Sequence, residues 1–153
     1  MQAFHLLGSA PFYTNSFLLL TKAGHAVIID PAAEVQEYDK ILRDHGAVLT
    51  HILCTHGHYD HVGSAGVLSR EWGAKIWCEA ADCAGTQLFP LKSADFGYEE
   101  GANLSVDELT FTAWHTPALS SCWASATPIR WTACPNWPKS ARACASSRMR
   151  TTS

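Results

Sequence analysis

The sequence has no hydrophobic run long enough to cross a membrane. Its aliphatic runs are short, such as residues 18–20 (LLL) and 27–29 (VII), whereas a membrane-spanning helix needs about 20 apolar residues. The first nine residues, MQAFHLLGS, also lack the basic start and long apolar stretch of a secretory signal. We therefore expect no membrane partner and a cytoplasmic location.

The net charge is small, and closely spaced pairs of cysteines are absent. The formal net charge is −3, which gives the chain no electrostatic reason to bind nucleic acid. No two cysteines are spaced as C-x-x-C, and the six cysteines stand at positions 54, 78, 83, 122, 134 and 144. In a chain without a signal peptide, this spacing favours reduced and mostly buried thiols over a disulfide framework.

Acidic residues are absent from the last part of the chain. All 14 acidic residues lie within residues 1–116, whereas residues 117–153 contain five lysines or arginines and no acid. At 153 residues the chain is long enough for one hydrophobic core. We therefore divide it into a partial domain over residues 1–116 and an atypical basic tail over residues 117–153.

Two interpretations of this tail stay open. It shows no convincing period of 2 or 3.6 residues, so it is either a disordered basic extension or the product of a frame shift or foreign junction near codon 117. It is rich in Arg, Ala, Ser, Pro, Cys and Trp, a composition typical of GC-rich DNA translated out of frame. Its three tryptophans are unusual for a disordered segment, which favours the second interpretation.

The first 116 residues carry an orderly α/β pattern. Apolar residues predict strands over residues 3–9, 15–21, 25–30, 50–55, 75–78 and 108–115. Helical spacing and following glycines predict helices over 34–45 and 64–72, with a short helix over 79–85 and a loop over 87–102. Strands that lead into strand–helix–strand units indicate an α/β sandwich.

The segment THGHYDH (55–61) places three histidines and an aspartate directly after an apolar strand. His56 and His58 flank one residue, so their imidazoles can face the same way, while Asp60 and His61 can face a second position. Imidazole and carboxylate groups bind zinc and similar divalent ions, and a bound ion lowers the pKa of its water toward about 7. The segment therefore predicts a metal centre with hydrolytic chemistry.

This segment, preceded by HILC and followed by VGS, resembles the H-x-H-x-D-H signature of the metallo-β-lactamase-fold metallohydrolases. The AVIIDP (26–31) and WHTP (114–117) segments resemble flanking parts of that family, nearest its hydroxyacylglutathione hydrolase (glyoxalase II)-like branch. The resemblance covers about residues 3–117. It implies the N-terminal half, and part of the second half, of an αββα sandwich.

The resemblance also implies roles for the site residues. His56 and His58 would serve a first metal, Asp60 and His61 a second, and Asp60 would also orient the attacking hydroxide. The cofactor would be one or two zinc ions, with iron or manganese as alternatives. The substrate would be a small molecule with an ester, thioester or amide carbonyl. Asp30 would support the site from behind, or would simply cap the next helix.

The sequence does not complete this pattern. The family continues with Gly-His after HTP, but Ala118 and Leu119 stand there, and no histidine follows His115. His115 is either a substitute ligand or a strand-end histidine with a structural hydrogen bond. We therefore expect an impaired hydrolase or, alternatively, a non-catalytic truncated fragment that binds metal weakly. An incomplete sandwich would also expose apolar sheet surface and favour self-association.

Overall fold

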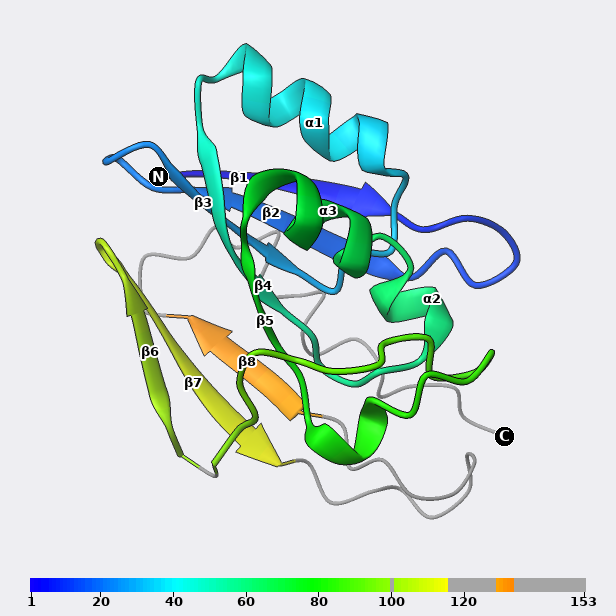
Figure 1. Cartoon of the computed structure of the whole chain (residues 1–153). Helices are drawn as coiled ribbons and strands as arrows, with labels where there is room; N and C mark the ends of the chain where they lie inside the picture. Colours follow the sequence, from blue (N-terminus) through cyan, green and yellow to red (C-terminus); the bar gives the residue numbers. More distant parts are fainter. Residues whose placement is uncertain (100, 116–128, 134–153) are drawn as a thin grey trace, which may run out of the picture.

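The computed structural model describes residues 1–99, 101–115 and 129–133, which form two β-sheets with helices on one side (Figure 1). One sheet has the strand order β1-β2-β3-β4-β5 and the other the order β6-β7-β8. The strands are β1 (Gln2–Leu7), β2 (Asn15–Leu20), β3 (His25–Ile29), β4 (Val48–Leu53), β5 (Lys75–Trp77), β6 (Asn103–Val106), β7 (Leu109–His115) and β8 (Ile129–Ala133). The helices are α1 (Val35–Asp44), α2 (Tyr59–Val62), α3 (Ala65–Trp72) and the 3-10 turn η1 (Ala80–Asp82).

The five-stranded sheet changes from antiparallel to parallel pairing at β3. Strands β1, β2 and β3 pair antiparallel, whereas β3, β4 and β5 pair parallel. Parallel neighbours need a crossover connection, which α1 supplies between β3 and β4, and the α2–α3 segment supplies between β4 and β5. The carboxyl ends of β3, β4 and β5 therefore lie at the same edge of the sheet.

The two longer helices form where the sequence predicts them. In α1, Tyr38 and Leu42 are fully buried against the sheet, as the apolar spacing within residues 34–45 indicates. Gly46 follows α1 with a φ of 59°, and Gly73 ends α3 with a φ of 70°. Glycine adopts this left-handed conformation without strain, which is why both helices end there.

A hydrophobic cluster lies on each face of the five-stranded sheet. On one face, Tyr38 of α1 and Leu68 of α3 belong to the larger cluster. On the other face, Val27 and Leu53 belong to a cluster with Phe111 of the three-stranded sheet. The described residues thus form a helix layer and two packed sheets, which confirms the predicted α/β sandwich class.

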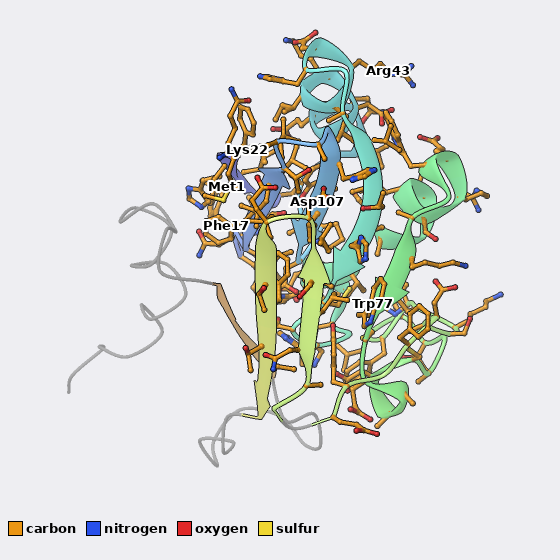
Figure 2. The ribbon with its side chains drawn as sticks, turned by 90° about the vertical axis from the view of Figure 1, so that its left-hand side faces the viewer. Met1, Phe17, Lys22, Arg43, Trp77 and Asp107 are labelled. Atoms are coloured by element: carbon orange, nitrogen blue, oxygen red, sulfur yellow. The ribbon has the colours of Figure 1, made fainter. Side chains whose placement is uncertain are left out.

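The β6–β7 hairpin is fastened to the larger sheet at its tip. Figure 2 shows Asp107 at this tip, and its Oδ2 accepts hydrogen bonds from Thr21 Oγ1 at 2.6 Å and from His25 Nδ1 at 2.8 Å. Glu108 accepts another from the backbone N–H of Lys22 at 2.8 Å. The hydrogen bonds from Thr21 and His25 hold the pKa of the Asp107 carboxyl below its ordinary value. The tip therefore joins the two sheets through polar contacts as well as apolar ones.

Three short elements, α2, β6 and β8, lie outside the sequence predictions. Helix α2 and strand β6 have four residues each, too few to show a period. Strand β8 falls within residues 117–153, and its pairing with β7 rather than its own pattern defines it. In the part of the chain that the structure describes, no helix is long and apolar enough to cross a membrane.

Candidate metal centre

The THGHYDH segment leaves the edge of the sheet where β4 ends, and its last residues begin α2 (Figure 1). His56 and His61 are buried, while His58 and Asp60 are half-buried. The ring centroid of His56 lies 3.9 Å from that of His61 and 4.7 Å from that of His58. Oδ2 of Asp60 lies 3.6 Å from Nε2 of His61. The structure thus brings together all four residues named from the sequence.

Asp30 supports this cluster from the end of β3. It is 5% exposed and has a φ of 47°. Its carboxylate accepts hydrogen bonds from the backbone N–H and the hydroxyl of Thr55, both at 2.7 Å, and from Nδ1 of His61 at 3.0 Å. Helix α1 instead begins after Glu34, without a side-chain cap. Of the two roles considered for Asp30, the structure supports the one behind the site.

This hydrogen-bond network determines which ring nitrogen carries the proton in His56 and in His61. The Asp30 carboxylate can only accept, so His61 carries its proton on Nδ1. Thr55 donates its hydroxyl proton to Asp30, and its oxygen therefore accepts from Nδ1 of His56 at 3.1 Å. These tautomers are assigned from the hydrogen-bond network. Both rings keep the lone pair of Nε2 available for a ligand, as metal-binding histidines require.

The four candidate side chains are of the types that bind divalent cations, but they are not arranged around a single ion. Burial, followed by the neighbouring His61, lowers the pKa of His56 from 6.5 to about 4, so this ring is neutral and able to bind metal near pH 7. Among the described residues, however, no three His, Cys, Asp or Glu side chains are arranged to hold an ion. Positions 118 and 119, where the sequence departs from the family pattern, lie outside the described residues.

Two further polar side chains hold the segment in place, and neither is among the residues named from the sequence. Thr14, just before β2, donates to Oδ2 of Asp60 at 2.7 Å. Asp82, at the end of η1, accepts a hydrogen bond from the backbone N–H of Gly57 at 3.0 Å, and burial raises the pKa of the Asp82 carboxyl. Their only sequence signal is a polar residue at an element boundary, 46 and 25 positions from the group each one binds.

Aromatic side chains lie beside the polar cluster. The ring of Phe89 stacks on His58 at 4.6 Å between centroids, and Phe12 meets Tyr59 edge to face at 5.9 Å. Phe12 and Tyr59 are 57% and 44% exposed. Apolar surface next to convergent polar groups is typical of small-molecule sites, so these rings can contact the apolar part of a ligand.

Comparisons with known proteins indicate the family of this chain. A family model described as the metallo-beta-lactamase superfamily matches residues 9–122. The chain is 29% identical over 120 residues to hydroxyacylglutathione hydrolase GloC of Haemophilus influenzae, covering 69% of this chain and 57% of that protein. The crystal structure of BLEG-1 B3 metallo-beta-lactamase has a TM-score of 0.70 at 20% identity, over 85% of this chain and 66% of that one. The crystal structure of ETHE1 from Myxococcus xanthus has a TM-score of 0.68 at 23% identity, over 87% and 54%.

These matches differ in what they establish. The chain spans about half the length of the curated relatives it matches, 50% and 57% for two of them. The similarity to the two crystal structures, below 25% identity, supports the fold alone. The family match covers most of the chain and includes Asp30 and the whole THGHYDH segment. This chain therefore belongs to the metallo-beta-lactamase superfamily.

Proposed function

We propose that the chain is built for metal-dependent hydrolysis of an ester, thioester or amide carbonyl in a small molecule. The observation that carries the proposal is the convergence of the four candidate ligands, with the Nε2 lone pairs of His56 and His61 left free by the Asp30 network. The similarity to a hydroxyacylglutathione hydrolase favours a thioester among these substrates.

Each candidate ligand has a role in this proposal. His56 and His58 would hold one cation, and Asp60 and His61 a second. A bound divalent cation would supply a nucleophilic hydroxide at neutral pH and would polarise the substrate carbonyl. The Asp60 carboxylate, which accepts a hydrogen bond from Thr14, would accept another from the attacking water and so orient it. Imidazole-rich donors favour zinc, with iron or manganese as alternatives.

A second candidate function is weak metal binding without turnover. Zinc in hydrolytic sites usually has three protein ligands, and the sequence has Ala118 and Leu119 where the family pattern has Gly-His. The open geometry of the described ligands favours this alternative as well. Resequencing the source DNA across codons 110–125 tests whether a frame shift causes this departure from the family pattern. A second frame that encodes Gly-His, followed by a later acid and histidine, would give an intact site.

Zinc titration of the full chain against a chromogenic chelator, with hydrolysis of a chromogenic thioester in parallel, separates the two functions. A hydrolase binds one or two zinc ions and loses turnover on chelation and in the His56→Ala and His58→Ala variants. His45→Ala, which removes an exposed histidine after α1, should behave like the wild type. Zinc bound below one ion per chain, without chelator-sensitive turnover, supports the alternative. Equal zinc affinity in wild type and His56→Ala would show that the proposed site is wrong.

A further inference from the structure

The turn that separates His56 from His58 lies against a buried carboxylate from a distant part of the chain. Asp82 is only 3% exposed, and its Oδ2 accepts the backbone N–H of Gly57 at 3.0 Å. Asp82 is itself fixed, because its own N–H bonds to the carbonyl oxygen of Glu79 at 3.0 Å within η1. A carboxylate held in this way is a stationary acceptor for the turn.

The contact between the turn and η1 is also steric. A Cβ atom added at Gly57 would lie 2.3 Å from the backbone oxygen of Asp82 and 2.7 Å from its Cβ, distances that real Cβ contacts do not reach. Only glycine lets the backbone approach η1 this closely. Gly57, which has no side chain, and the carboxylate of Asp82 therefore both allow the turn to pack directly against η1.

The hydrogen-bonded amide joins residue 56 to residue 57. Because the peptide unit is planar, fixing its N–H also fixes the direction in which the chain leaves His56 and enters Gly57. The packing of Gly57 against Asp82 fixes the point from which the chain continues to His58. Hydrogen bonds to an ionised acceptor are stronger and more directional than neutral ones. Groups that orient metal ligands from behind change metal affinity by about 10–100-fold when they are removed.

We propose that Asp82 is a positioning residue of the metal centre, which acts by holding the Gly57 amide and through it the two flanking imidazoles. The proposal rests on the metal-binding function proposed above. It gives a function to Asp82, a buried acid in a short 3-10 turn outside the THGHYDH segment.

Three variants of the full chain test this role. Asp82→Ala removes the acceptor, Asp82→Asn keeps an acceptor oxygen of the same shape, and Asp95→Ala is the matched control. Asp95 also accepts a backbone N–H through its carboxylate, that of Ile76 at 2.9 Å, but it lies beside β5 rather than at the His-rich turn. Each variant is compared with the wild type in zinc affinity by chelator competition, and in exchange of the Gly57 amide by NMR on the metal-free chain.

We expect Asp82→Ala to weaken zinc binding about 10–100-fold and to speed Gly57 exchange by at least about tenfold, with the amides of β4 unchanged. Asp82→Asn keeps a neutral acceptor that makes a weaker bond, so it should fall between Asp82→Ala and the wild type in both readouts, and Asp95→Ala should not change either one. Unprotected Gly57 in the wild type, or equal effects of Asp82→Ala and Asp82→Asn, would overturn the proposal. A wild type that binds no zinc but protects Gly57 through Asp82 would instead refute the metal-binding function, and the role of Asp82 would be limited to ordering the turn.

Discussion

Replacing Asp30 by asparagine would test the network that sets the proton positions of two imidazoles. The new side chain would keep the size of the old one, and asparagine tolerates the φ of 47° found here. Its oxygen can still accept the Thr55 N–H, as Oδ1 does now. The other side becomes an amide NH2 that faces two donors, the Thr55 hydroxyl and Nδ1 of His61. The backbone stays in place while the hydrogen-bond polarity on one side is reversed.

The size of the effect depends on how these two donors respond. Each hydrogen bond to an ionised acceptor contributes about 1.5–3 kcal/mol, and each neutral one about 0.5–1.5 kcal/mol. The hydroxyl can rotate, and His61 can move its proton from Nδ1 to Nε2, so that both groups accept from the new amide. The bond from the Thr55 N–H also loses its ionised acceptor, so exchanging three charge-assisted bonds for three neutral ones should lower the free energy of unfolding by about 3–4.5 kcal/mol.

The decisive observation is the tautomer of His61. Long-range nitrogen–proton NMR spectra of the metal-free chain near pH 7 should show the proton on Nδ1 in the wild type and on Nε2 in Asp30→Asn. Because a proton on Nε2 occupies the lone pair that would bind metal, zinc affinity should fall at least about tenfold. Asp44→Asn is the control, since Asp44 is exposed and pairs with Lys40, and it should change neither quantity.

One result would refute this reasoning. If Asp30→Asn keeps the proton of His61 on Nδ1 and unfolds in urea within about 0.5 kcal/mol of the wild type, Asp30 does not control the imidazole. Its three hydrogen bonds would then be incidental to the site.

Two further substitutions test packing and pH dependence. Gly57→Ala should lower the free energy of unfolding in urea by about 1–3 kcal/mol, because its Cβ would meet a backbone oxygen at 2.3 Å. Gly66→Ala, in α3 with open space around its Cβ, should raise it by up to about 1 kcal/mol, and a loss as large as that of Gly57→Ala would contradict the steric argument. Asp107→Asn should flatten the loss of stability in acid. Hydrogen bonds from Thr21 and His25 lower the pKa of the Asp107 carboxyl below 3.8, so its contribution is present above that value and lost as the pH falls through the lowered pKa. Thermal melts from about pH 2 to pH 7 check this, and parallel curves for variant and wild type would disprove it.

The sequence predicts those parts of the fold that have a local signal. Strands β1 to β5 and helices α1 and α3 are predictable because apolar periods and terminal glycines specify them within a single window. Strand β8 depends on partners in β7, and no local pattern records that pairing. The β6 strand is indistinguishable from a loop in the sequence because four residues are too few to alternate visibly.

The same distinction applies to the candidate site. The four ligands of the THGHYDH segment lie within seven consecutive positions, so their chemistry and spacing can be recognised together. Asp30 stands out at a strand end but keeps two possible roles, because only the structure shows that its carboxylate meets Thr55 and His61 rather than α1. Thr14 and Asp82 escape sequence analysis, since long-range packing alone brings them to the segment.

The three supporting groups explain how an open set of ligands stays ordered without metal. Asp30 holds His61, Thr14 holds Asp60, and Asp82 holds the turn at Gly57, so each support comes from a different element and acts on a different part of the segment. Folding therefore orients His61, Asp60 and the turn at Gly57 before a cation binds, which reduces the conformational entropy that metal binding has to overcome, although among the described residues no three side chains are yet arranged to hold an ion. Zinc affinity in this chain should then depend on how many of these side chains can reach one ion rather than on disorder of the segment.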